Sequence, residues 1–97
     1  MANRTSSNPV VLDTFTSDVV ISTGRTRVRK IVLASAAAGD VLEFINNAGQ
    51  PQLRMVQTLS PGWEETDLDG FTFDGGLIFD QSASTGLGAG DLVFIYL

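Results

Sequence analysis

The residues best suited to binding chemistry are basic and lie close together. Four of the six basic residues fall within six positions, at Arg25, Arg27, Arg29 and Lys30. Because side chains alternate along a strand, the three arginines would share one face and could bind an acidic protein or a phosphate. The alternative is a solvent-exposed face balanced by nearby carboxylates, which is the usual environment of arginine. If the stripe binds a partner, an acidic protein fits the net charge of −5 better than DNA does.

A second cluster is acidic and lies between Trp63 and Gly70. Its members are Glu64, Glu65, Asp67 and Asp69. Closely spaced carboxylates suit a hard cation such as calcium, but no glutamate follows Asp67 at the position that closes an EF-hand loop. A charged edge strand that resists aggregation explains the same residues. The pattern leaves both interpretations open and favours the edge strand, so we assign no metal site.

Catalytic chemistry has little support in the composition. The chain contains no histidine and no cysteine, which removes the usual general base, the thiolate nucleophile and the commonest metal ligands. The glycine-rich segment Gly86–Gly90 precedes a strand, whereas a phosphate-binding loop needs a helix N-terminus after it. We therefore expect no catalytic residue, no cofactor and no enzyme activity.

Size and charge narrow the possible functions further. A chain of 97 residues forms one domain, and without disulfides or a structural metal its stability alone should be modest, which favours oligomerisation. The negative net charge opposes binding to nucleic acid and to anionic membranes. No apolar run reaches the length of a membrane span, and residues 1–8 contain no signal-peptide segment. We expect a protein made in the cytoplasm, with neither nucleic acid nor membrane as a partner.

The elements that would position these residues are all strands. From Pro9 onward short apolar runs alternate with turn residues, and no long stretch has helical spacing. The predicted strands span residues 10–15, 18–22, 26–35, 41–46, 52–58, 63–68, 71–80 with a bend at Gly75-Gly76, and 91–97. The spacing of the turns predicts an antiparallel β-sandwich or jelly-roll-like domain of about 7–8 short strands over residues 9–97. Residues 1–8 would form an extended polar arm.

Alternation also predicts the core. Residues at i and i+2 share a face of a strand, and the pairs with this spacing are Leu42 and Phe44, Leu53 and Met55, Phe71 and Phe73, Leu77 and Phe79, and Phe94 and Tyr96. Val28 is expected inside because arginines flank it. Residues 30–33 do not alternate, so a bulge after Arg29 and a strand buried on both faces both remain open. We expect Trp63 to be partly buried core, with a contact anchor as the alternative.

The last strand, residues 91–97, is apolar on both faces. One face can meet the core of the chain, but the other needs a further layer or a second subunit. The polar arm has almost no apolar content to hold it on its own domain, so we expect it to lie on a neighbouring subunit. The candidate partner-binding residues therefore come from the arm, the arginine stripe and one face of the last strand; they are Arg4, Arg25, Arg27, Arg29, Val93, Ile95 and Leu97.

The order of these parts resembles the small β-sandwich virion proteins of tailed bacteriophages. The matching parts are a polar arm, the strand Arg27–Leu33, the small-residue turn Ala36–Asp40, the strand Val41–Asn46, the segment Phe73–Phe79, and the strand Asp91–Tyr96 after a glycine-rich loop. This resemblance covers most of the chain, and the group includes head decoration (cement) proteins and tail or fibre accessory proteins.

The resemblance implies a non-enzymatic structural protein of a phage virion. The role that this resemblance implies first is that of a capsid decoration protein, which stabilises the shell by clamping neighbouring capsid subunits. The expected partners are the major capsid protein or another virion protein, together with further copies of the chain, with a trimer favoured. The alternative is a carbohydrate- or receptor-binding module of a phage tail or fibre, which would need exposed aromatic side chains around a cleft.

Overall fold

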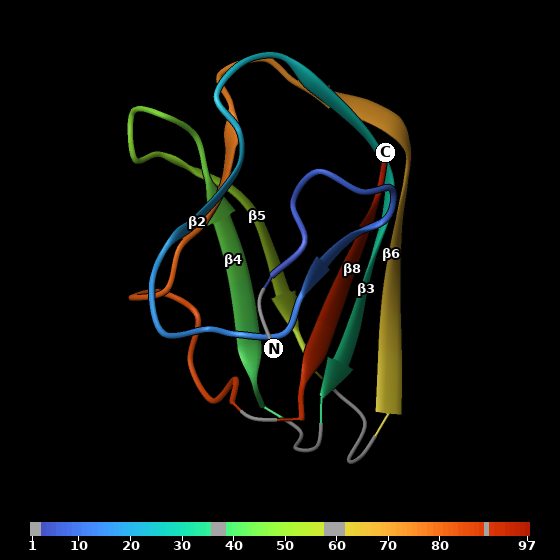
Figure 1. Ribbon diagram of the computed structural model, residues 1–97, viewed down its shortest axis with the longest axis vertical. Coiled ribbons are helices and arrows are strands. Elements are labelled where there is room, and N and C mark those ends of the chain that lie inside the picture. Colours follow the sequence, from blue (N-terminus) through green and yellow to red (C-terminus); the bar gives the residue numbers. More distant parts are fainter. Residues whose placement is uncertain (1–2, 36–38, 58–61, 89) are drawn as a thin grey trace.

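A computed structural model describes residues 3–35, 39–57, 62–88 and 90–97. Over these residues the chain forms eight strands and no helix, in two antiparallel four-stranded sheets that pack face to face (Figure 1). The prediction of an all-β antiparallel sandwich is confirmed. Four predicted segments extend beyond the described residues: residues 1–2 of the arm, residues 36–38 of the small-residue turn, residue 58 of the fifth strand, and residue 89 of the glycine-rich segment.

Each sheet combines strands from distant parts of the sequence. Sheet A contains, in spatial order, β1 (Val10–Leu12), β8 (Leu92–Tyr96), β3 (Thr26–Ser35) and β6 (Gly62–Phe73). Sheet B contains β2 (Val19–Ser22), β7 (Leu77–Phe79), β4 (Val41–Ile45) and β5 (Pro51–Val56). The basic strand β3 is therefore central in sheet A, and the acidic strand β6 is one of its edges.

One predicted turn is instead a bulge inside a strand. Asp69 and Gly70 both have positive φ, at 50° and 76°, yet β6 continues through them. The register between β3 and β6 shifts between Val28 and Lys30, so that one residue of β3 lies opposite three residues of β6. The chain reverses at Asp74-Gly75 instead. The left-handed residues bend β6 without ending it, because extra residues in one strand of an antiparallel pair can be accommodated as a bulge.

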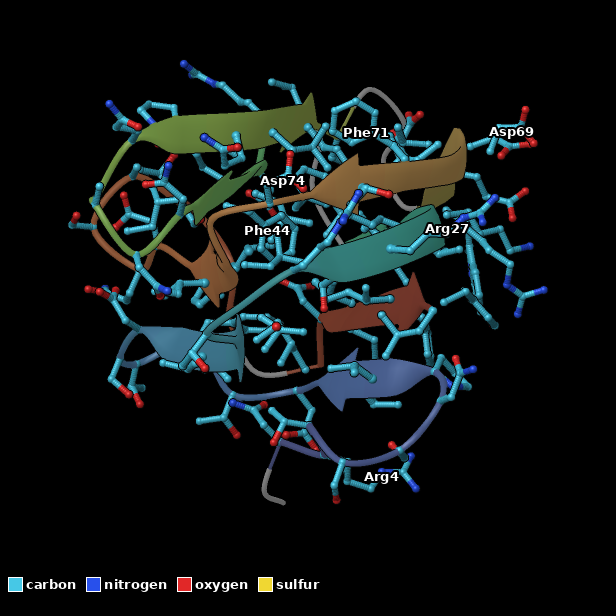
Figure 2. All side chains as sticks on the ribbon, turned by 90° about the horizontal axis from the view of Figure 1, so that it is seen from above. Arg4, Arg27, Phe44, Asp69, Phe71 and Asp74 are labelled. Carbon is cyan, nitrogen blue, oxygen red and sulfur yellow. The ribbon has the colours of Figure 1, made fainter. Side chains whose placement is uncertain are left out.

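The core lies between the two sheets, where Figure 2 shows Phe44. Most of the predicted core is confirmed, since the side chains of Leu42, Phe44, Leu77, Phe79 and Val28 are all fully buried. Met55 is buried and Leu53 packs against the core from its margin. Phe73 is also buried, but its expected partner Phe71 is 56% exposed. Phe71 lies on the edge strand β6, where no further strand of its sheet covers it.

The predicted orientation of the last strand is wrong. Val93 and Ile95, expected to bind a partner, are fully buried in the core. Phe94 and Tyr96, expected in the core, lie on the opposite face and are only partly buried. The reason is the position of β8 between β1 and β3, whose inward-facing residues lie opposite Val93 and Ile95. Leu97 lies beyond the end of β8 and is 38% exposed.

The arm folds back on its own domain. The backbone of Arg4 pairs with Val11 through two hydrogen bonds, at 2.8 and 2.9 Å. Asn3 Oδ1 accepts two backbone N–H bonds from the residues that follow β1, and Asn8 Oδ1 accepts the backbone N–H of Leu97 at 3.0 Å. The premise that the arm needs a neighbouring subunit is therefore wrong, because polar hydrogen bonds hold it where apolar contacts are lacking.

Candidate functional site

The candidate site is the outer face of sheet A, which its register defines. Residues directly opposite one another in antiparallel strands share a face. The first row across this face holds Trp63, Ala34 and Leu92; the second holds Glu65, Val32, Phe94 and Val11; the third holds Asp67, Lys30 and Tyr96. Beyond the bulge the same face continues with Arg27 and Arg29. The face thus has an apolar end and a charged end.

The apolar end is an aromatic patch, formed by Trp63, Phe94, Leu92 and Ala34; Val32 and Val11, in the second row, are buried. Trp63 is 64% exposed and stacks on Phe94, with ring centroids 5.9 Å apart and planes inclined by 7°. The expectation that Trp63 belongs to the core is wrong. Trp63 lies on an edge strand, in the outward phase, and its cross-strand neighbour Ala34 is too small to cover it. Exposed indole rings of this kind are typical of contact surfaces.

The charged end is a groove of about 510 Å³, which we call the arginine groove. It is lined by Arg27, Arg29, Asp67, Asp69, Gly70 and Leu97, and Figure 2 shows Arg27 and Asp69 on the outer side of sheet A. The Arg29 Nε donates a hydrogen bond of 3.0 Å to the carbonyl oxygen of Leu97. The Arg27 guanidinium lies against Gly70, where an added Cβ would come within 2.4 Å of its Nε. A glycine is therefore required for this position of Arg27.

The predicted arginine stripe does not act as one unit. Arg25 Nε pairs with Asp74 at 3.2 Å, with both side chains mostly exposed, which matches the solvent-exposed alternative. Lys30 Nζ pairs with Glu65 at 3.1 Å and lies 4.9 Å from the centre of the Tyr96 ring. These contacts balance the two cations within the chain, and exposed pairs of this type contribute little stability.

Arg27 and Arg29 differ from Arg25 in their partners. Among the residues that the structure describes, neither guanidinium forms an ion pair with an aspartate or glutamate side chain, and Arg29 donates instead to the backbone oxygen of Leu97. Asp67 and Asp69 nevertheless line the same groove. The fourth predicted arginine, Arg4, is exposed beside β1, with β1 and β8 between it and the groove. The structure therefore brings two of the four candidate arginines together.

The acidic cluster is divided by the sheet. Glu65 and Asp67 lie on the outer face, whereas Glu64 is opposite the buried Leu33 in the alternate phase. Asp67 Oδ1 accepts the backbone N–H of Asp69 at 2.9 Å, within the bulge. Within the described ranges no group of three acidic, histidine or cysteine residues is placed to hold a metal ion. Asp67 and Asp69 instead form the negative side of the arginine groove.

Two buried carboxylates were missed by the sequence reasoning. Asp40 and Asp91 are 8% and 5% exposed, and each follows a glycine and precedes a strand. Asp91 Oδ2 accepts the backbone N–H of Gly88 at 2.9 Å, and Asp40 lies against Gly86. The repeated Gly-Asp before an apolar strand could have identified both. Their contacts organise the loop between β7 and β8, at a distance from the outer face of sheet A.

Comparison with known proteins gives no relative for this chain. No family model matches it, and no curated protein and no solved structure matches it either. Over the described ranges, no helix is long and apolar enough to span a membrane.

Proposed function

We propose that this chain is a non-enzymatic structural protein that binds other protein subunits through the outer face of sheet A. The observation that carries the proposal is the exposure of Trp63 on top of Phe94. Stacking holds the indole in one orientation, so little conformational entropy is lost when a partner covers it. Tryptophan anchors with this arrangement are enriched among the residues that dominate binding energy.

We propose further that the subunits it binds belong to the virion of a tailed bacteriophage. The support is the resemblance of its arm, strands and turns to the small β-sandwich virion proteins. In this role the chain is made in the host cytoplasm and decorates the capsid, with the major capsid protein or another virion protein as its partner. A protein that binds only the assembled shell stabilises that shell by mass action.

Cosedimentation with intact capsids that lack the protein tests this proposal. Trp63→Ala should reduce the bound fraction at least about tenfold, since it removes the exposed anchor. Val20→Ala is the matched control, because Val20 is a 49% exposed apolar residue in β2 of the opposite sheet. Equal binding of the wild-type chain and the Trp63→Ala variant would overturn the assignment of this face, and failure of the wild-type chain to bind would overturn the virion role.

A carbohydrate- or receptor-binding module is the second candidate, and one observation favours it. Such a module needs an exposed aromatic ring and a cleft with polar side chains, and the outer face of sheet A carries Trp63 at one end and the arginine groove at the other. Binding of the wild-type chain to host-surface glycans, with no binding to capsids, would select this function. Loss of that binding in Trp63→Ala would assign it to the same face.

A further inference from the structure

We infer that the outer face of sheet A binds the same face of a second copy of this chain, around a two-fold axis parallel to the strands between β3 and β6. The inference rests on the proposed function, because it takes this face to be a protein contact and names the partner. The features that would recognise the partner are the basic residues of β3 and the acidic residues of the adjacent strand β6.

The charges on the face are sorted by strand. The basic residues Arg27, Arg29 and Lys30 come from β3, and the acidic residues Glu65, Asp67 and Asp69 come from β6. A two-fold contact uses the same patch on both subunits, so the patch must be complementary to itself. Adjacent basic and acidic strands satisfy this requirement when the two-fold axis exchanges them.

The register specifies which residues would meet. A two-fold axis in the plane of the interface and parallel to the strands exchanges β3 with β6 and preserves position along the strand. Each residue of β3 then faces the partner copy of its own cross-strand neighbour. Because Lys30 lies opposite Asp67, Lys30 meets the partner's Asp67. The strands of the two sheets remain nearly aligned, as in the common packing of stacked sheets.

The same symmetry covers the apolar end. Trp63 on β6 stacks on Phe94 on β8, so each indole lies over its own β3, the strand between them. In the dimer this ring faces β6 of the partner, and the indole that is 64% exposed in the single chain becomes covered.

The arginine groove favours this partner over an acidic protein. The sequence alone suggested an acidic surface for the arginines, but the fold places Asp67 and Asp69 in the same groove. An acidic partner would be repelled by these carboxylates. A second copy offers both signs: its Asp67 would join Lys30 and Glu65, which pair within the chain, and Arg27 would face its Thr72.

The charges on β6 also disfavour edge-to-edge pairing of two copies of the chain. The free edge of β6 could pair with the β6 edge of another copy, but four carboxylates on this strand would then face four more. Charged edge strands commonly prevent such pairing. Face-to-face contact avoids this repulsion.

Sedimentation velocity over a dilution series of the full chain tests the inference with charge-reversed variants. The wild-type chain should form dimers at micromolar concentration. Lys30→Glu and Asp67→Lys should each weaken dimerisation at least about tenfold, because like charges then meet at both symmetric positions. An equimolar mixture of the two variants should form dimers again, since each introduced charge meets an opposite charge on its partner. Native mass spectrometry identifies the mixed dimer by mass.

Arg25→Glu is the matched control, because Arg25 belongs to the same stripe but pairs with its own Asp74; this variant should dimerise normally. Circular dichroism should show an unchanged β spectrum for every variant. A monomeric wild-type chain, or a mixture of variants that stays monomeric, would overturn the inference. Capsid cosedimentation reports separately on the proposed function: a monomer that still binds capsids through Trp63 contradicts only the dimer, and a dimer that ignores capsids contradicts only the virion role.

Discussion

The two ends of the outer face of sheet A offer a partner different chemistry, one aromatic and one charged. At the aromatic patch, Trp63 stacks on Phe94 on one side and remains 64% exposed. At the arginine groove, the chain brings opposite charges into one hollow and leaves Arg27 and Arg29 without ion pairs to an aspartate or glutamate in the described part of the chain. Apolar burial supplies most of the affinity of a contact, and charge complementarity sets its register and rejects wrong partners. We therefore expect the aromatic patch to supply most of the affinity for a partner, and the arginine groove to determine which partner binds.

Removal of the indole should have the largest effect. Trp63→Ala should raise the dissociation constant of the complex about tenfold to a hundredfold, which corresponds to about 1.4–3 kcal/mol. The melting temperature should hardly change, because the ring covers little of the core. Sedimentation equilibrium and differential scanning calorimetry measure the two quantities. A fall in melting temperature without a loss of affinity would make the ring a structural residue.

Reversal of the two groove arginines should have a smaller and salt-dependent effect. The double variant Arg27→Glu, Arg29→Glu should weaken complex formation about tenfold at low ionic strength, and the difference should shrink as salt screens the charges. The free energy of unfolding should fall only slightly, because the exposed hydrogen bond from Arg29 to the backbone oxygen of Leu97 is lost but no pair with an aspartate or glutamate of the described residues is broken. Affinity measurements at several salt concentrations test this. A loss that does not depend on salt would contradict an electrostatic role.

Substitution of Gly70, the glycine in the β6 bulge, should slightly lower the free energy of unfolding and displace Arg27 in the arginine groove. Gly70→Ala places a Cβ against the Arg27 guanidinium at a residue with φ of 76°. We expect a loss of about 1 kcal/mol in the free energy of unfolding, because a left-handed conformation strains alanine, together with a shift of Arg27. Gly49→Ala is the control, because Gly49 also has positive φ but open space around it. Chemical denaturation of both variants separates strain from the displaced arginine.

The smallest effect should come from the arginine outside the groove. Arg25→Ala removes an exposed ion pair with Asp74, and we expect a change of about 0–1 kcal/mol in stability with no change in affinity. Thermal denaturation and the binding assay together measure both. A marked loss of affinity would extend the contact beyond the groove and return Arg25 to the binding stripe.

Local patterns predicted the strands well because each signal acts within a few residues. Alternation and turn residues placed Phe44 and Phe79 in the core and located the strands, except that β6 continues through the predicted break at residues 69–70 and β7 begins only at Leu77. The same patterns could not orient β8, since both of its faces are apolar and the choice depends on its neighbours β1 and β3. Nor could they distinguish a bulge from a turn at Asp69-Gly70, because both use left-handed residues.

The site was only partly predictable for a similar reason. The sequence identified Arg27 and Arg29 as binding residues, but the carboxylates that share their groove come from β6, whose register with β3 is a long-range property. Trp63 was assigned to the core because a lone tryptophan is usually buried. Its exposure follows from an edge position and a small neighbour, neither of which the sequence alone reveals.

Trp63 also provides the most direct test of the central claim, that the outer face of sheet A becomes covered when the protein assembles. It is the single tryptophan of the chain, so its fluorescence reports on this face alone. Acrylamide quenching should be strong in dilute solution and should fall as the concentration of the chain rises or capsids are added. A quenching constant that stays high under all these conditions would show that the face remains open and would contradict the account.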